Sequence, residues 1–306
     1  MFFEEQRMYE APMPLHPFLC MGCWNIDSEG HHAVMQSILA RPENTLILMG
    51  DNAYPKNSSE PISKEFVFGE FDKLKSKMKF VALGNHNYDD RGVLEKEFAL
   101  HNEQPTWNMP HNYYSYVFQD RVAIVVLDTA PFHFWATSPP QDNLTLADAE
   151  PMLLWLEQTV KTLAKANIPY YIIQHDPFVL RKRDMVRYMR QGHTILDKLW
   201  EYPPIRILCA DTHNFQEGRF MYKGTEFRQC IVGTGGGTPD DVYEIAKDKQ
   251  FSVSYKMDTF HRGYGYARVS DERGPVEFIK VMDWGRKTKK TRKGGRRIPK
   301  RYTKNK

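Results

Sequence analysis

A short apolar run that ends in polar residues constrains the fold of this chain more than any other feature. The run is Leu46-Ile47-Leu48-Met49, and Gly50-Asp51-Asn52-Ala53-Tyr54 follows it directly. Consecutive apolar residues of this length are typical of a buried strand, and a glycine after them allows the backbone to turn sharply. In open α/β sheets, ligands bind beyond the carboxyl ends of the strands. We therefore expect Asp51 and Tyr54 to belong to a functional site.

The same pattern occurs at four further places, where an apolar run ends in side chains that can bind a metal ion. Those side chains are Cys23, Asn85, His86, His175, Asp211 and His213. Any one of them is more often structural, and glycine followed by Asp or Asn is ordinary turn chemistry. Five strand exits that all carry such groups are not explained by turn formation alone. Carboxylate, amide, phenol and imidazole ligands suit Fe, Mn or Zn, so the sequence predicts a site for one or two of these ions.

Strands and helices alternate over most of the chain, and a strand-rich segment forms the last third. The spacing of apolar residues predicts helices over residues 31–39, 63–77 and 146–166, and a basic helical segment over 181–199. Residues 1–16 show little periodicity and are expected to form an irregular arm. This order of elements favours an α/β sandwich with two mixed β-sheets.

The composition is that of a globular protein of 306 residues, with 41% hydrophobic and 13% aromatic residues. No apolar run approaches the ~20 residues of a transmembrane helix, and the N-terminus lacks the features of a signal peptide. We therefore expect an intracellular protein, in the cytoplasm or nucleus, with no membrane partner. Four cysteines in so long a chain do not form a disulfide framework, and Cys20, Cys209 and Cys230 are expected to be buried apolar side chains.

The charge of the chain is unevenly distributed. Residues 286–306 contain twelve Lys and Arg and no acidic residue, which leaves 30 basic against 38 acidic residues in the body. We expect one catalytic domain over residues 1–285 and a basic tail over 286–306 that does not fold alone. Such a tail suits contact with nucleic acid, an acidic partner or a nuclear-import receptor, and it would also suit a protein packaged in a virion. These alternatives stay open.

Taken together, the polar strand exits resemble the motifs of a known family. The matching stretches are Gly22-Cys23-Trp24-Asn25, Gly50-Asp51-Asn52-Ala53-Tyr54, Gly84-Asn85-His86-Asn87, His175-Asp176-Pro177 and Ala210-Asp211-Thr212-His213-Asn214-Phe215-Gln216. They are similar to G-D-W-G, G-D-N-x-Y, G-N-H-D, H-x-P and G-H-D-H-N-L-Q of the calcineurin-like metallophosphoesterases, most closely the purple acid phosphatase branch. The resemblance covers roughly residues 17–283, and it implies a four-layer α/β/β/α sandwich.

The resemblance also implies a role for each matching side chain. Asp51 would bridge two metal ions at the centre of the site. The other ligands would be Cys23, Tyr54 and His213 for the first ion, and Asn85, His175 and Asp211 for the second. Asn85 and His86 are the candidate catalytic residues, and His86 would bind no metal but stabilise charge on the phosphoryl group or protonate the leaving oxygen. The implied reaction is hydrolysis of a phosphate ester by a metal-bound hydroxide; the resemblance points to monoesters, with phosphodiesters and nucleotides also open.

Two positions depart from the family pattern. Cys23 stands where the family has aspartate, and Asp211 stands where it has the first histidine of G-H-x-H. Thiolate binds Zn or Fe and carboxylate binds Mn or Mg, so either can still be a ligand. Three outcomes follow: a two-metal enzyme with shifted metal preference, a one-metal enzyme, or an inactive phosphatase fold. In the last case the protein would act through its tail, as a nucleic-acid-associated or virion structural protein. Activity is favoured because five residues of the family pattern are retained: Asp51, Asn85, His86, His175 and His213.

Three further histidines, His111, His133 and His261, lie in segments that read as polar or aromatic loops. Surface histidine is the expected assignment for each, although one of them could line a substrate cleft. The run Gly233-Thr234-Gly235-Gly236-Gly237 lacks the Gly-Lys-Ser/Thr ending of a P-loop. We expect it to form a turn, and the resemblance places such a glycine-bearing loop at the border of the site.

Overall fold

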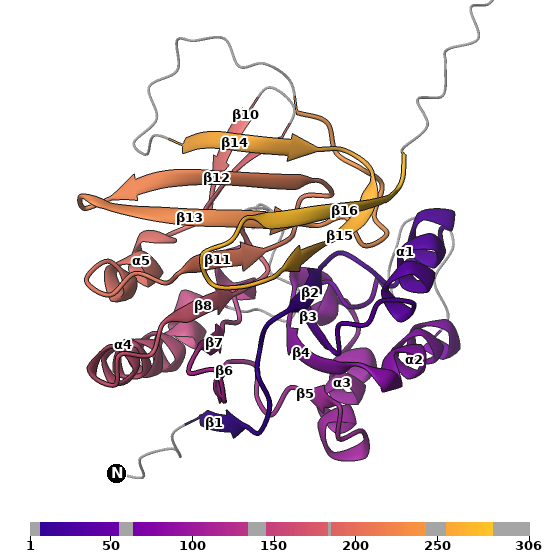
Figure 1. Cartoon of the computed structure of the whole chain (residues 1–306), viewed down its shortest axis with the longest axis horizontal. Coiled ribbons are helices and arrows are strands. Elements are labelled where there is room, and N and C mark those ends of the chain that lie inside the picture. Colours follow the sequence, from indigo (N-terminus) through magenta and orange to yellow (C-terminus); the bar gives the residue numbers. More distant parts are fainter. Residues whose placement is uncertain (1–6, 55–63, 134–144, 183–184, 243–254, 284–306) are drawn as a thin grey trace, which may run out of the picture.

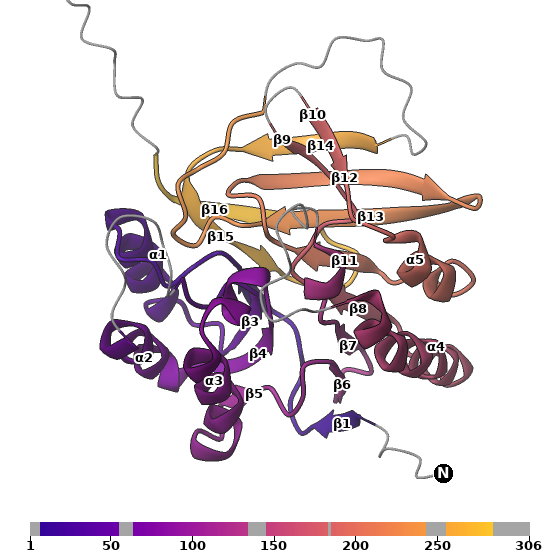
Figure 2. The same cartoon turned by 180° about the vertical axis from the view of Figure 1, so that it is seen from behind.

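The strand exits of the sequence belong to two mixed β-sheets in a computed structural model of the chain. The structure describes residues 7–54, 64–133, 145–182, 185–242 and 255–283. Figure 1 shows the sheets lying against each other, with one group of helices outside each of them. The reverse view in Figure 2 shows the same four layers, in the order helix, sheet, sheet, helix. The predicted α/β sandwich with two mixed sheets is therefore confirmed.

The larger sheet has eight strands in the order β1-β6-β7-β8-β11-β13-β12-β14. Its strands, in that order, are Met8–Ala11, Tyr114–Phe118, Ala123–Val126, Tyr170–Ile173, Arg206–Cys209, Thr225–Val232, Phe215–Tyr222 and Tyr255–His261. The central strands β7, β8, β11 and β13 run parallel to one another. Because parallel strands share one carboxyl edge, the residues that follow β8 and β11 emerge at the same side of the sheet.

The smaller sheet has six strands in the order β16-β15-β2-β3-β4-β5. Their bounds, in that order, are Val276–Met282, Tyr264–Val269, Phe18–Met21, Thr45–Met49, Met78–Ala82 and Trp107–Asn108. Strands β2 to β5 are parallel neighbours, whereas β15 and β16 add an antiparallel edge. The predicted strands over β2, β3 and β4 are confirmed, and their exits lie side by side.

Five helices cover the two sheets. The first three, α1 (Glu29–Leu39), α2 (Lys64–Lys73) and α3 (Arg91–Glu103), lie outside the smaller sheet, and α4 (Glu150–Lys165) and α5 (His193–Leu199) lie outside the larger one. Ser28 precedes helix α1 and caps it, because its hydroxyl accepts a hydrogen bond from the backbone N–H of His31. Within the described residues, none of the helices is long and apolar enough to cross a membrane.

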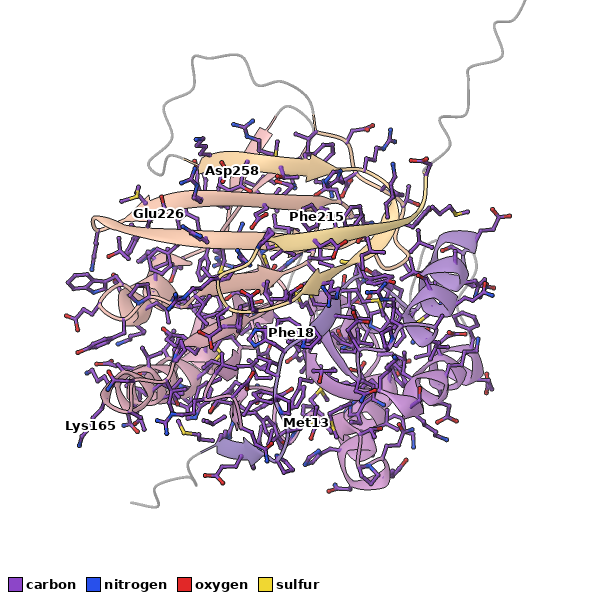
Figure 3. The ribbon with its side chains drawn as sticks, in the orientation of Figure 1. Met13, Phe18, Lys165, Phe215, Glu226 and Asp258 are labelled. Carbon is purple, nitrogen blue, oxygen red and sulfur yellow. The ribbon has the colours of Figure 1, made fainter. Side chains whose placement is uncertain are left out.

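Two hydrophobic clusters hold the layers together. The first fills the space between the sheets and under α1 to α3, and the second fills the space between the larger sheet and α4 and α5. Phe18 packs edge-on against Tyr171 across the sheets, with ring centres 5.6 Å apart, and Phe215 stacks on Phe278 at 4.8 Å. Figure 3 shows Phe18 and Phe215 in this region. Contacts between rings from both sheets fix the relative position of the two sets of strand exits.

Three local predictions were wrong. The arm over residues 1–16 contains β1, which pairs in parallel with β6. The segment 181–199 is not one basic helix, because β9 (Val179–Lys182) and β10 (Met185–Tyr188) form an antiparallel hairpin before the short helix α5. His261 ends strand β14 and does not lie in a loop.

Some predicted features cannot be placed. The basic tail over 286–306 and the first residue of the predicted helix over 63–77 lie outside the described residues. The division into a domain over 1–285 and a tail stays a prediction.

Candidate metal centre

The predicted ligands converge because each of them follows a parallel strand and a tight turn. Gly50 adopts a φ of +83°, and a Cβ atom there would lie 2.6 Å from Nδ1 of His175. Only glycine therefore lets the turn after β3 approach the turn after β8 so closely. The backbone N–H of Cys23 donates to the carbonyl of Gly50 at 3.1 Å, which joins the exits of β2 and β3.

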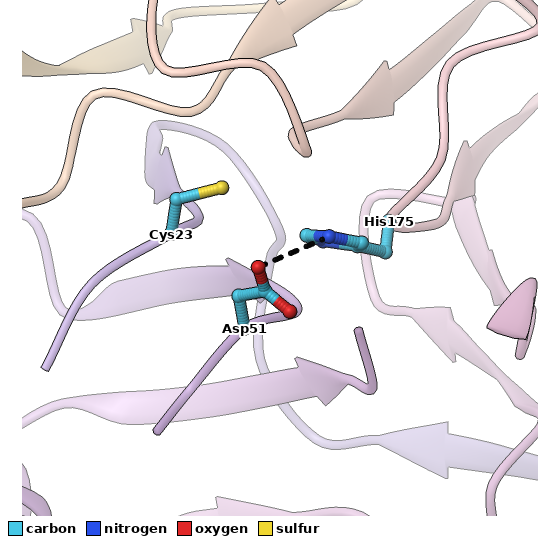
Figure 4. Close-up of side chains that lie close together, drawn as sticks. All are labelled: Cys23, Asp51 and His175. Atoms are coloured by element: carbon cyan, nitrogen blue, oxygen red, sulfur yellow. Dashed lines mark ion pairs between the residues drawn. The ribbon is translucent and has the colours of Figure 1, made fainter. Parts of the chain in front are cut away.

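Asp51 lies at the centre of the site and is buried, with 2% of its surface exposed. The hydroxyl of Tyr54 donates to Oδ2 of Asp51 at 2.9 Å, and the backbone N–H of His86 donates to Oδ1 at 3.0 Å. Nε2 of His175 lies 3.4 Å from Oδ2, and a dashed line marks this ion pair in Figure 4. Burial opposes ionisation, but the charge of His175 and these hydrogen bonds hold the pKa of Asp51 well below its usual range. The side chain is thus a buried carboxylate with both oxygens engaged.

His175 supplies the observation that most directly tests whether a metal ion fits. Its Nδ1 lies 2.9 Å from the carbonyl oxygen of Met49, a contact in which Nδ1–H is the donor. Its Nε2 is buried and makes no hydrogen bond among the described residues, and its contact with Asp51 at 3.4 Å is an ion pair. A histidine whose far nitrogen is held by a carbonyl presents its other nitrogen to a metal in many metal sites. Burial lowers the pKa of His175, but Asp51, Asp176 and Asp211 raise it to about 10, so their field favours a cation here.

Cys23 completes a group of three buried ligands. Its sulfur, a carboxylate oxygen of Asp51 and a ring nitrogen of His175 all lie within 4.8 Å of one another. Figure 4 shows the thiol directed toward the same space as the Asp51 carboxylate. Burial and the charges of Asp51 and Asp211 raise the pKa of Cys23 well above its ordinary value, which keeps the side chain a thiol. A bound cation would reverse this preference, since metals deprotonate a coordinating thiol.

His213 and Tyr54 border this group. Nδ1 of His213 lies 3.1 Å from the carbonyl oxygen of Thr238, and its Nε2 lies 3.5 Å from the hydroxyl oxygen of Tyr54. Burial and the negative charge of Asp51 raise the pKa of Tyr54 well above 10, so the phenol stays protonated. Its hydroxyl group donates a hydrogen bond to Asp51. The turn over Gly233–Gly237 also borders the site, because the N–H of Gly237 donates to the carbonyl of Cys23 at 3.2 Å.

Structural comparisons identify the fold in which this site is built. No family profile matches the sequence, and a search of curated proteins finds no relative. Solved structures match over most of the chain. A purple acid phosphatase from yellow lupin (Lupinus luteus) seeds matches with a TM-score of 0.58 and 12% identity, over 89% of this chain and 52% of that protein. A dimetal phosphatase from Danio rerio matches with a TM-score of 0.51 and 14% identity, over 88% of this chain and 99% of that one.

The chain has the calcineurin-like metallophosphoesterase fold. A third match, GAP50, described as the anchor in the inner membrane complex of Plasmodium, has a TM-score of 0.58 and 14% identity and covers 89% of this chain and 90% of that one. At such low identity these likenesses establish the fold alone. They establish no activity for this chain.

His86 lies at the open edge of the metallophosphoesterase-like site. Its side chain is 38% exposed, its Nδ1 lies 2.7 Å from Oδ2 of Asp89, and its ring lies 4.6 Å from that of Tyr54. Burial lowers the pKa of His86, but Asp89 and Asp51 raise it above the ordinary histidine value. Asn85 precedes it in a short 3₁₀ helix, Asn85–Asp89, and is half-buried. The predicted catalytic pair therefore lies beside Asp51, at a partly exposed position.

A second group of ligand-type side chains adjoins the first, and sequence reasoning missed two of its members. His133, Asp176 and Asp211 have ligand atoms within 4.8 Å of one another. Asp211 was a predicted ligand, whereas His133 was expected at the surface and Asp176 was not singled out. His133 directly follows a 3₁₀ turn after β7, and only its neighbourhood in the fold identifies it as part of the site. The predicted partner of Asp211, His175, instead lies nearest to Asp51.

A buried network of amide and carboxylate side chains supports the ligand-bearing turns. Nδ2 of Asn52 donates to Glu97 at 3.1 Å, and its Oδ1 accepts from the indole N–H of Trp24 at 2.9 Å. Asn87 also donates to Glu97, and its Oδ1 accepts from the N–H of Gly84 at 2.8 Å and of Asn52 at 3.3 Å. The turns after β2, β3 and β4 are thus tied to one carboxyl group on α3. Sequence reasoning missed Glu97 because it did not predict α3.

Proposed function

We propose that this protein is a metal-dependent phosphoesterase that hydrolyses phosphomonoesters. The observation that carries the proposal is the convergence of a thiol, a carboxylate and an imidazole, all buried, whose ligand atoms lie within 4.8 Å of one another. Nε2 of His175 makes no hydrogen bond among the described residues and lies 3.4 Å from the Asp51 carboxylate. Burying such polar groups together is costly unless they are paired or coordinate a metal ion. The likeness of the fold to dimetal phosphatases supports the assignment of this group to metal binding.

The proposed ligands are the seven residues predicted from the sequence. Cys23, Asp51 and His175 would form the core of the site, with Tyr54 and His213 on one side and Asn85 and Asp211 on the other. When bound, the ions would supply Lewis-acid charge that stabilises phosphoryl oxygens and lowers the pKa of a coordinated water. The mixture of one sulfur with nitrogen and oxygen ligands is compatible with Zn, Fe or Mn.

His86 would act on the substrate side of the site. Asp89 fixes the orientation of its ring through Nδ1, which leaves Nε2 to contact the phosphate ester. Its raised pKa keeps a proton available near neutral pH, which suits a donor to the leaving oxygen. Tyr54 would position Asp51 by its hydrogen bond and pack against the ring of His86. These residues would orient the carboxylate and the proton before the substrate arrives.

The proposal is tested with chelator-treated protein to which Mn, Fe or Zn is returned before a chromogenic phosphomonoester is added. We expect turnover with at least one metal and none without. Asp51→Ala should remove both the metal and the activity. His86→Ala should retain the metal and lower the rate by about 10²–10⁴-fold, the usual contribution of a general acid. His193→Ala, at an exposed position on α5, is the matched control. Full activity of His86→Ala would refute its assignment, and inactivity with every metal would refute the enzyme.

A binding function is the second candidate. Its support is the match to GAP50, a protein of this fold described as an anchor, together with Cys23 and Asp211 at two ligand positions. In that case the basic tail over 286–306 would contact nucleic acid or an acidic partner, in a virion or elsewhere. Removing the tail would then abolish the function, whereas a phosphoesterase would still hydrolyse small esters without it.

A further inference from the structure

A cavity of about 370 Å³ lies on the larger sheet, apart from the candidate metal centre. Four strands and one turn line it: β11, β12, β13, β14 and the turn that joins β15 to β16. Arg206, which begins β11, lies in its wall, whereas Asp211 follows the other end of the same strand. None of the metal-ligand groups found among the described residues includes a residue that lines this cavity. The cavity is therefore separate from the site proposed for catalysis.

Cationic side chains from four neighbouring strands form a row along the cavity. Arg219 of β12 is paired with Arg228 of β13 on one side and with Lys256 of β14 on the other. Arg206 adds a fourth charge, because the parallel register of β11 and β13 places it beside Arg228. Paired residues on adjacent strands point to the same face of a sheet, and like charges at such positions repel each other. The row therefore favours an anion nearby.

Carboxylates of the protein neutralise only part of this charge. Oδ2 of Asp258 lies 3.0 Å from Nε of Arg219, and Oε2 of Glu226 lies 3.4 Å from Nη1 of Arg219. Figure 3 labels both carboxylates on this part of the larger sheet. The cavity and an adjoining one of about 270 Å³ are together lined by five cationic and three acidic residues: Arg206, Arg219, Arg228, Lys256 and Arg273, and Glu217, Glu226 and Asp258. The lining thus has a surplus of two positive charges.

Arg206 is a buried cation whose contacts are long. Only 4% of its side chain is exposed, and its Nε has no hydrogen-bond partner among the described residues. Nη1 and Nη2 each lie 3.5 Å from the carbonyl oxygen of Gly274, and Nη2 lies 3.4 Å from Oε1 of Glu217. A guanidinium has five N–H donors, and burying its charge is costly unless it is well paired and hydrogen-bonded. An anion in the cavity would supply the missing acceptors.

We propose that this cavity binds a phosphate group, as the free ion or as part of a small phosphorylated molecule. Arginine forks match the geometry of phosphate oxygens, and a phosphate monoester carries a charge of about −1.5 to −2 at pH 7, which matches the surplus. The cavity has the size of a small-molecule site, and two extra charges are too few for the many phosphate contacts of a nucleic-acid site. Arg206 of the larger sheet and Arg273 of the β15–β16 turn would both contact the phosphate. The bound anion would thus connect the two sheets.

Titration calorimetry of the full-length protein tests this proposal, with inorganic phosphate and phenylphosphonate as the probes. The phosphonate has a carbon–phosphorus bond, which hydrolysis of phosphate esters does not cleave. Each titration is run before and after chelator treatment, so that phosphate bound to a metal ion is recognised by its loss. We expect wild type to bind one phosphate that survives chelator treatment. The basic tail is the same in every variant, so its contribution cancels in the comparison.

Four variants separate this site from general attraction of anions. Arg273→Gln, at an exposed position, and Arg206→Gln should each weaken phosphate binding about tenfold or more, and Arg273→Gln decides the matter if Arg206→Gln fails to fold. Glu217→Gln should strengthen binding roughly two- to fivefold, because it removes a carboxylate that competes for Arg206. Arg91→Gln, whose side chain is 85% exposed on α3, is the matched control and should leave the affinity unchanged.

Binding of both probes would identify a phosphorylated small molecule as the ligand, and binding of phosphate alone would identify the free ion. Unchanged phosphate affinity in Arg273→Gln would overturn the proposal, and so would a wild type that binds neither probe after chelator treatment. A wild type that binds single-stranded RNA but neither probe, and loses the RNA in Arg273→Gln, would replace the small ligand by a nucleic acid. None of these measurements depends on catalysis, so failure here leaves the proposed phosphoesterase untouched.

Discussion

Glu97 allows a quantitative test of the network beneath the ligand-bearing turns. The side chain is fully buried on α3, and both of its oxygens accept hydrogen bonds, from Asn52 and Asn87. Burial raises the pKa of Glu97 from 4.5 to about 8, against the opposing effect of the two amide donors, and the charge of Asp51 adds to the rise. At neutral pH the folded protein therefore retains a proton that the unfolded chain has released.

The sign of the pH dependence follows from that difference. Below about pH 4.5 both states carry the proton, and burial of Glu97 imposes no penalty. Between 4.5 and about 8 only the unfolded state has lost it, so the free energy of unfolding falls as pH rises. The slope is at most about 1.4 kcal/mol per pH unit, which amounts to roughly 4–5 kcal/mol over the window. Above about pH 8 the folded state ionises as well and the loss stops.

Replacing Glu97 by glutamine isolates this contribution. The amide resembles the protonated carboxyl group in shape, but its NH2 group would face one of the two amide donors, so Glu97→Gln should be less stable than wild type near pH 5. Between pH 5 and pH 8 the variant should gain stability relative to wild type by several kcal/mol, because it has no proton to lose. Urea unfolding of chelator-treated protein, followed by circular dichroism at several pH values, measures the difference between the two proteins. Other titrating groups are common to both and cancel.

Glu95→Gln is the matched control. Glu95 lies on the same helix but is 64% exposed and pairs with Arg91, so its replacement should shift stability little at any pH. Parallel stability curves for wild type and Glu97→Gln would refute the reasoning.

Three further outcomes are expected. Gly50→Ala should reduce metal content and lower stability by about 1–2 kcal/mol or more, because φ is +83° and the added Cβ meets His175; unchanged metal content and melting temperature would contradict this. Cys23→Asp should shift the preference of the site from Zn toward Mn in competition titrations, since it exchanges sulfur for oxygen. Deletion of residues 286–306 should weaken nucleic-acid binding and flatten its salt dependence while turnover of a small phosphomonoester is retained; binding that stays equally salt-dependent would contradict the assigned role.

The ligand-bearing turns could be predicted because their local sequence determines both backbone and chemistry. An apolar run forms a buried strand, a glycine such as Gly50 or Gly84 allows the turn, and the next residue reaches the carboxyl edge. Asp51 follows this rule, and so does Asn85 in the next strand exit. Convergence of the two sheets could not be derived from any one of these stretches, because it depends on packing between rings such as Phe18 and Tyr171.

The missed elements have physical causes that a linear pattern hides. Helix α3 buries Val93, Glu97 and Leu100, so a carboxylate interrupts its apolar face and weakens the helical periodicity. The hairpin of β9 and β10 has basic residues at spacings that also suit a helix. Its geometry depends on Gln216, which donates to the carbonyl of Arg181 at 2.7 Å and accepts from its N–H at 3.0 Å. Both contacts join residues far apart in sequence.

The backbone at the candidate site carries strain of a kind that packing alone would not select. Cys23, Asp51 and Asp211 have φ values of +53°, +51° and +60°, in the left-handed region that costs a residue with a Cβ roughly 1–2 kcal/mol. All three follow strands that end at the site, and all three are ligand-type residues. Glycine would relieve the strain at each position but would remove the side chain. Positive φ also occurs at ordinary turns, for example at Arg121 and Lys223, but at these three positions it directs a thiol and two carboxylates toward one region, as the proposed metal binding requires.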